Sequence, residues 1–185
     1  MIEKILNILE TADTTQLEHM KLKLGVQVLC HNIWMTSIIL FMSWHLGLFQ
    51  ESLILFLSYG ILKINVGGVH FNKSWQCLTV TTSFIIGGVL LAHNMALQWG
   101  WIVVLYVFSI LVLWIVGPQG TQNNPISDKN YPILRRRSLY IVLFYFGLTV
   151  SGVLDQNTMY LLLIAVLLGT YSVISCKIQN SHCSS

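Results

Sequence analysis

The feature that most constrains this chain is its long stretch without formal charge, residues 74–127, which lies between Lys73 and Asp128. A helix needs roughly 20 apolar residues to cross a membrane. Charged residues make up 9% of the whole chain, against about 25% in ordinary soluble domains. A soluble fold of 185 residues is therefore excluded. A single-span anchor is excluded as well, because the length has room for about six crossings.

The apolar runs are continuous and do not alternate with polar residues, as in the run from Trp99 to Val116. This pattern predicts helices, because lipid offers no partners to open backbone groups. We therefore expect an all-α polytopic membrane protein with about six transmembrane helices and both termini in the cytoplasm. The expected spans are 25–49, 52–62 with an extension past Lys63, 74–92, 99–116, 138–153 and 158–175.

Two segments stand apart from these spans. Residues 1–24 mix charged and apolar residues near helical spacing, which predicts an amphipathic helix at the membrane interface. This start lacks the basic region and cleavage site of a signal peptide, so we expect it to be retained. Residues 25–185 then form a single membrane domain. Within it, residues 117–137 contain all three prolines and three consecutive arginines, which predicts a polar cytoplasmic loop.

The basic residues predict the orientation. Six crossings place all ten Lys and Arg residues on one side, and the opposite turns near Glu51, Asn94 and Asp155 have none. By the positive-inside rule the basic side faces the cytoplasm. The basic residues are not accompanied by aromatic stacking residues, so nucleic acid is a poor partner. Membrane lipid or an acidic peptide fits better.

The four cysteines are scattered, with neither paired nor zinc-like spacing. We therefore expect no disulfide framework, no metal site and no cofactor. His70 and Cys77 form the pair with chemical potential, because a thiolate is a nucleophile and histidine commonly activates it. An unbroken helix would separate them by about 10 Å, so His70 has to precede the helix that carries Cys77.

Three residues support that break. Gly67 and Gly68 provide a structural turn, and Asn72 is a candidate N-cap for a helix that begins at Lys73. Residues 76–83 are unusually polar for a span, and such residues commonly face a bundle interior. On one face lie Cys77, Thr81, Phe84 and Gly88, and we expect Gly87 and Gly88 to let helices approach closely.

The residues alone leave other interpretations open. A cysteine in a membrane helix is commonly a packing residue, and a histidine near a span end commonly sits at the interface. The chain could be a small membrane transporter or exporter of a peptide or metabolite, in which residues 76–83 line a pathway and Cys77 is incidental. It could also be a non-catalytic scaffold.

The sequence resembles the accessory gene regulator B (AgrB) family of membrane cysteine endopeptidases in Gram-positive quorum sensing. The resemblance rests on the Gly67-Gly68-Val69-His70 motif, on Cys77, on Lys63 and on the loop prolines Pro118 and Pro125. It extends to the six-span layout. The chain departs from the family in two places. Lys63 stands where arginine is more common, and Gln119 and Gly120 stand where an acidic residue is common.

The resemblance implies that His70 and Cys77 are the catalytic pair. The substrate would be an AgrD-like propeptide with an amphipathic leader, a core and an acidic C-terminal tail. Cys77 would attack the bond after the core, and the resulting thioester would close to a thiolactone or lactone. The family also implies a homodimer in the cell membrane, with its active site at the cytoplasmic face. We expect further substrate contacts from basic and amide side chains, namely Lys63, Asn72, Lys129, Arg135, Arg136 and Arg137.

Overall fold

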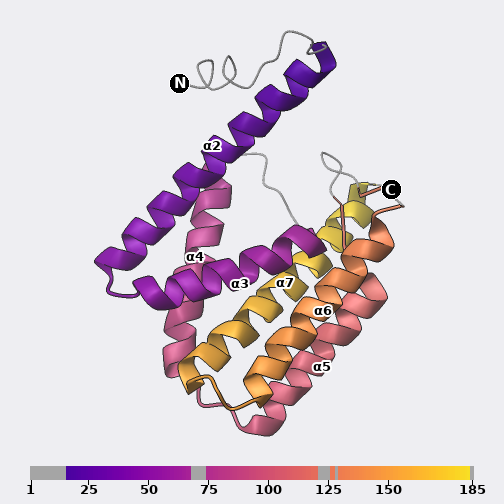
Figure 1. The fold of residues 1–185 in the computed structure, drawn as a ribbon. Helices are drawn as coiled ribbons and strands as arrows, with labels where there is room; N and C mark the ends of the chain where they lie inside the picture. The colour runs from indigo at the N-terminus through magenta and orange to yellow at the C-terminus, as the bar shows by residue number, and fades with distance from the viewer. Residues whose placement is uncertain (1–15, 68–73, 121–125, 128, 184–185) are drawn as a thin grey trace. The chain divides into compact units, whose positions relative to one another are not determined.

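The computed structural model describes residues 16–67, 74–120, 126–127 and 129–183. In this part of the chain it has six α-helices and no β-sheet (Figure 1). The chain divides into two compact units, Met1–Leu46 and Gly47–Ser185. The predicted all-helical class is confirmed for the described residues.

The described part of the first unit is one helix, α2 (Gln16–His45). It continues through residues 24 and 25 without a break, although the sequence predicts a boundary there between an interfacial helix and a span. Residues 1–15 lie outside the described residues, so the amphipathic start remains a prediction. Two serine hydroxyls in α2 are satisfied within the helix: Ser37 Oγ donates to the Ile33 carbonyl oxygen and Ser43 Oγ to the Ile39 carbonyl oxygen, each at 2.8 Å.

The second unit contains five helices. They are α3 (Phe49–Val66), α4 (Ser74–Asn94), α5 (Trp99–Val116), α6 (Tyr131–Val150) and α7 (Gln156–Cys183). At one end of the unit, the residues after α5 contact the ends of α3 and α7, and the start of α6 contacts the end of α5. At the other end, the start of α3 meets the end of α4. Successive helices therefore run in opposite directions.

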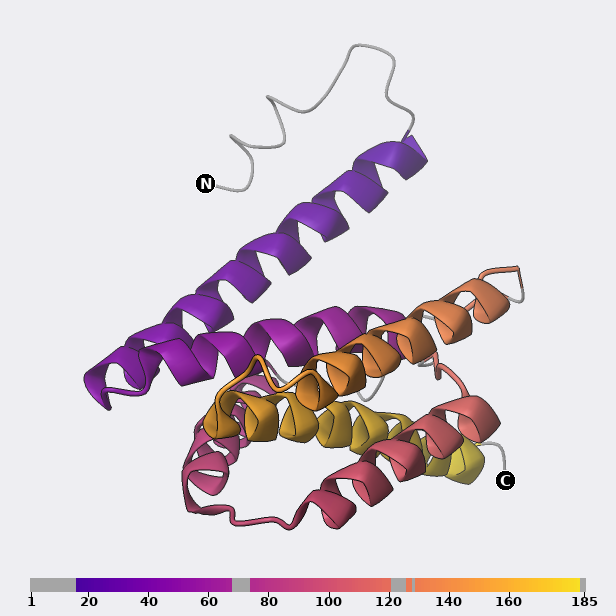
Figure 2. The same cartoon turned by 60° about the horizontal axis from the view of Figure 1, so that its bottom comes forward.

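Helix α7 is the core of this unit and lies among α3, α5 and α6 in both views (Figures 1 and 2). In its apolar stretch 67% of the residues are buried, against 22% in α4 and in α5. Residues 160–166 of α7 are all buried. The remaining helices expose apolar side chains outward, as a lipid-facing surface requires.

Glycines let neighbouring helices approach α7. A Cβ on Gly88 of α4 would lie 2.8 Å from Leu55 Cδ2 and 3.2 Å from Ile164 Cγ2. The expected close approach is thus confirmed at Gly88. At Gly87 the prediction is wrong, because that glycine is exposed and has open space around it. Gly169 of α7 makes a similar approach to Leu62 of α3.

Buried hydroxyls connect three of the helices. The Tyr106 hydroxyl of α5 lies 3.1 Å from Thr149 Oγ1 of α6, and the Tyr145 hydroxyl donates to the backbone oxygen of Ser58 in α3 at 3.2 Å. Polar groups inside a membrane bundle need partners of this kind. These bonds fix α3, α5 and α6 to one another.

Three helices are long and apolar enough to cross a membrane in the described part of the chain: Trp75–Asn94, Trp99–Val116 and Gln156–Gln179. They coincide with three of the predicted spans. The other predicted spans correspond to α2, α3 and α6, so six crossings, and the side on which the termini lie, stay predictions. Helix α3 does extend past Lys63 and ends before Gly67, as its sequence indicates.

The structure corrects several boundaries. Helix α2 ends at His45 and α3 begins at Phe49, where spans 25–49 and 52–62 are expected. Helix α6 begins at Tyr131, so the three arginines lie in a helix and not in a loop that lasts to residue 137. Pro132 is in the first turn, where its fixed φ suits a helix and its missing N–H costs nothing. Helix α7 continues to Cys183, eight residues beyond the expected span 158–175. A helix can continue past the apolar run that marks its membrane-spanning length, and both α6 and α7 do so.

Candidate active site

Cys77 is the fourth residue of α4 and lies in its first turn. The described part of the helix begins at Ser74, and the predicted start at Lys73 lies outside the described residues. The Cys77 side chain is half-buried and its thiol is free. The cysteine is therefore accessible at a helix end and is not enclosed in the core.

The face of α4 that carries Cys77 turns toward the core helix. Further along this face, Phe84 meets Tyr171 of α7 edge to face, with ring centroids 6.1 Å apart. One turn later Gly88 packs against α3 and α7. The predicted common face of Cys77, Phe84 and Gly88 is thus the inward face in this part of the helix. By contrast, Thr79 and Ser83 are exposed on the outside.

The other residues of the predicted motif are only partly described. His70, Gly68 and Asn72 lie outside the described residues, so the pairing of His70 with Cys77 stays a prediction. Gly67 is described and caps the end of α3, where its N–H donates to the Lys63 carbonyl oxygen at 2.9 Å. The predicted structural turn therefore begins at this glycine.

Residues after α5 hold this end of α3. The backbone N–H of Gln119 donates to the carbonyl oxygen of Val66 at 3.0 Å, and Gly67 and Gln119 form an isolated parallel bridge. Cys176 of α7 lies 3.6 Å from the Gly120 carbonyl oxygen. The sequence marks residues 117–120 only as a helix stop, and nothing in it indicates this contact with α3.

The predicted basic substrate contacts have three different surroundings. The Arg135 guanidinium donates to the carbonyl oxygen of Trp114 and lies 4.7 Å above the Trp114 ring, so it caps the end of α5. Lys129, Arg136 and Arg137 are exposed. Lys63 differs from both, because its Nζ lies over the Tyr59 ring at 5.4 Å. The exposed cations are the ones free to meet an acidic ligand.

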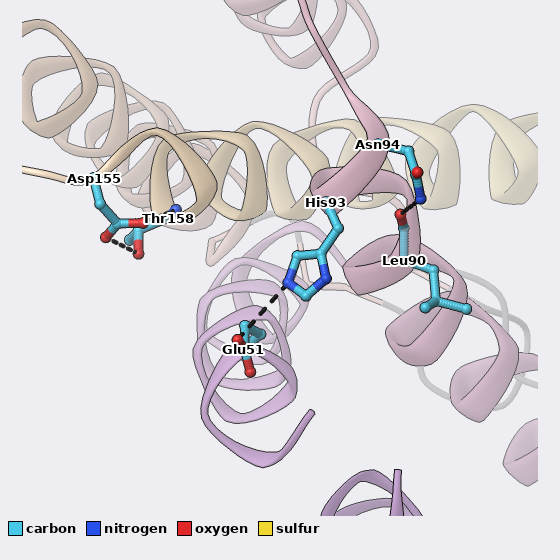
Figure 3. Close-up of polar contacts among 6 residues, drawn as sticks. All are labelled: Glu51, Leu90, His93, Asn94, Asp155 and Thr158. Carbon is cyan, nitrogen blue, oxygen red and sulfur yellow. Dashed lines mark hydrogen bonds and ion pairs between the residues drawn. The ribbon is translucent and has the colours of Figure 1, made fainter. Parts of the chain in front are cut away.

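Charge divides the α3–α7 unit into two ends. Its described Lys and Arg residues lie at the end where α4 begins: Lys63, Lys129, Arg135, Arg136, Arg137 and Lys177. Figure 3 shows the opposite end, where His93 Nε2 lies 3.7 Å from Glu51 Oε1 and Asp155 accepts hydrogen bonds from Thr158. Cys77 thus shares its end of the unit with the cations.

The Asp155 carboxylate belongs to a helix cap. Thr158 Oγ1 donates to Asp155 Oδ1 at 2.6 Å, and the Thr158 backbone N–H donates to Oδ2 at 3.0 Å. Both bonds favour the charged carboxylate, and they hold the pKa of Asp155 below its usual value. Among the described residues, no group of three or more His, Cys, Asp and Glu side chains could hold a metal ion.

Comparison with known protein families identifies the family of this chain. The family model described as Accessory gene regulator B matches residues 2–175. The chain belongs to the AgrB family. Membership connects it to the accessory gene regulator system of quorum sensing. The matched region includes the whole motif from Lys63 to Cys77 and continues into the core helix α7 as far as residue 175.

Curated AgrB relatives are distant in sequence. An AgrB-like protein of Clostridium acetobutylicum is 26% identical over 110 residues, which is 60% of this chain and 53% of that protein. The chain thus spans about half the length of that relative. Accessory gene regulator protein B of Staphylococcus aureus is 20% identical over 158 residues, 85% of this chain and 83% of that protein. No solved structure matches the chain.

Proposed function

We propose that this AgrB-family protein is a cysteine endopeptidase of a Gram-positive cell membrane. Its substrate is an AgrD-like propeptide with an amphipathic leader and an acidic tail. The enzyme removes the tail and closes the core to a thiolactone or lactone. The observation that carries the proposal is the place of Cys77: in the first turn of α4, half-buried, at the basic end of the unit, within a family match over residues 2–175.

The proposed chemistry uses two residues. The Cys77 thiolate attacks the carbonyl carbon of the last core residue, and the carbonyl oxygen becomes an oxyanion. When the C–N bond breaks, a thioester forms and the amine of the tail leaves with a proton from His70. The side chain of a Cys or Ser in the core then attacks the thioester, gives its proton to His70, and releases the Cys77 thiolate. No atom or electron is needed beyond these groups.

Two physical demands follow from this scheme. Water competes for the thioester, so the core nucleophile has to be held close, which effective molarities of about 10⁵ M or more can achieve. The half-buried position of Cys77 at a helix end suits a site that limits water. Forming a thioester from an amide is also uphill, so removal of the tail and export of the product have to draw the reaction forward.

The exposed cations suit the acidic tail. Lys129, Arg136 and Arg137 are exposed at the end of the unit that holds Cys77. We propose that they attract the tail and that the membrane orientation puts this end in the cytoplasm, as the positive-inside rule predicts. Arg135 is assigned a structural role, because its guanidinium already holds Trp114. Lys63 and Asn72 stay predicted substrate contacts, and a homodimer stays a family expectation.

Intact mass spectrometry tests the proposal. The purified protein is incubated in liposomes with its candidate propeptide, and Cys77→Ala is the comparison. We expect an adduct with the mass of leader plus core on the unmodified protein and none on Cys77→Ala, together with a free tail peptide from the unmodified protein. The Cys30→Ala variant is the control for thiol chemistry elsewhere, and it should form the same adduct.

The transporter interpretation makes the opposite prediction. If bound propeptide gives neither adduct nor cleavage, and if Cys77→Ala retains function, the endopeptidase proposal is wrong. The exposed positions of Thr79 and Ser83 do not favour a transport pathway along that side of α4, and Thr79 Oγ1 already donates to the Trp75 carbonyl oxygen at 2.9 Å.

A further inference from the structure

Helices α3 and α5 end in the same unusual way. Gly67 has φ 70° and ψ −147°, and Gly117 has φ 67° and ψ −174°. This region of backbone conformation is essentially confined to glycine. Each glycine N–H still bonds to its own helix, at 2.9 Å to Lys63 and at 3.0 Å to Leu113. Both helices are therefore stopped sharply, with their last carbonyl groups open to partners.

Gln119 supplies partners to both helix ends. Its backbone N–H donates to the Val66 carbonyl oxygen at 3.0 Å, and its side-chain Nε2 donates to the Val116 carbonyl oxygen at 2.9 Å. A Cβ on Gly67 would collide with the backbone carbonyl oxygen of Gln119. We name Val66, Gly67 and Gln119 the carboxyl-end clasp. Its contact is backbone against backbone, so no side chain can turn aside to relieve a change.

The clasp lies directly before the predicted catalytic segment. His70 is three positions after Gly67 in sequence, and three residues of chain span at most about 10 Å. A displacement of Gly67 therefore also displaces the region of space that His70 can reach. Gln119 belongs to the segment that follows α5. The clasp therefore also fixes the end of α3 relative to the end of α5.

We propose that Gln119 and Gly67 are positioning residues, whose backbone pairing sets the place from which the His70 segment approaches Cys77. This inference rests on the proposed function. Catalysis depends steeply on such placement, and a misplacement of about 1 Å can cost about a hundredfold in rate. A merely structural clasp would instead change the amount of folded protein and leave the chemistry of Cys77 as it was.

Two variants open the clasp in different ways. Gly67→Ala introduces the colliding Cβ, and Gln119→Pro removes the N–H that bonds to Val66. Each has a matched control. Gly152→Ala carries a comparable positive-φ strain, since Gly152 has φ 69° with open space around it. Gln119→Ala removes the side-chain amide but keeps the backbone N–H.

Two measurements are made on the whole protein. Each variant is purified as a monodisperse fraction and then reconstituted in liposomes. The first is kcat and KM for cleavage of the propeptide. The second, without substrate, is the rate of Cys77 alkylation by iodoacetamide as a function of pH, followed by peptide mass spectrometry. His70→Ala is the reference for a cysteine without its histidine, and Gln119→Pro serves as the second variant should Gly67→Ala not fold.

We expect Gly67→Ala and Gln119→Pro to lower kcat by about a hundredfold with little change in KM, and to give the alkylation profile of His70→Ala. Gly152→Ala and Gln119→Ala should resemble the unmodified protein. A wild-type alkylation profile in both clasp variants, whether or not kcat falls, would overturn the positioning role. If His70→Ala itself changes neither measurement, the proposed function fails and not the clasp alone.

Discussion

The two ends of the α3–α7 unit are built differently. At the basic end, helix termini are joined by backbone contacts and by the Arg135 guanidinium, and exposed cations surround them. At the other end, short turns are closed by side chains, as in the Asp155–Thr158 cap and the contact between the exposed His93 and the half-buried Glu51. Such side-chain contacts near the surface contribute little to stability. The basic end is thus the one where small changes in position should matter.

The largest expected effect is the difference between removing His70 and removing His93. His70→Ala should lower propeptide processing by about 10²–10⁴-fold, as expected for loss of a general acid and base. Cys77→Ala should abolish it. His93→Ala, at the opposite end, should process at the normal rate, because His93 and its partner Glu51 are remote from Cys77 along α4. Processing is measured by release of the tail peptide. Equal losses from the two histidine variants would remove the distinction between the ends.

Next in size is the cap on α5. Arg135→Ala should lower the free energy of unfolding by about 2 kcal/mol, because the Trp114 carbonyl loses a charged donor and the ring loses its stacked guanidinium. Arg135→Lys should lose part of this, since lysine has no planar fork. Thermal unfolding in detergent measures both. If the alanine variant unfolds normally but shows a raised KM, Arg135 is a substrate residue after all.

A smaller effect concerns substrate attraction. The Arg136→Glu, Arg137→Glu double variant should raise KM for the propeptide about tenfold at low salt, with kcat unchanged, because a repulsive field replaces an attractive one. The difference should shrink at 1 M salt, where the Debye length is about 3 Å. Glu51→Lys, which alters charge at the other end, is the matched control. A salt-independent change in KM would argue against tail binding by these cations.

The smallest expected effect lies at the opposite end. Because the folded-state pKa of Asp155 is lowered by Thr158, its cap contributes stability above the usual pKa of 3.8 and loses it as pH falls further through the lowered value. Asp155→Asn should therefore flatten the loss of thermal stability between pH 5 and pH 2, to a degree reduced by the exposure of the carboxylate. Parallel melting curves for the two proteins across this range would contradict the assignment.

Much of the fold is readable from local patterns. Apolar runs locate α4 and α5 almost to the residue and the start of α7 within two residues, because a membrane-spanning helix needs a run of about 20 apolar residues. Boundaries fail where helices leave the apolar layer, as at Tyr131 and Cys183. Cys77 is singled out by its residue type and spacing, and its role stays a prediction. The face that it shares with Phe84 and Gly88 turns inward at those two residues, but the same reasoning misassigned Gly87.

By itself the sequence determined that the chain is helical, where its apolar helices lie, how its charges are divided along the chain and, through the motif ending at Cys77, the family to which it belongs. Only the tertiary structure decided that α7 is the core, that Arg135 caps α5 while Arg136 and Arg137 stay exposed, and that Gln119 holds the end of α3. The reason is physical. Helix formation depends on neighbours within a few residues, whereas Val66 and Gln119 meet only because packed helices bring distant backbone groups together.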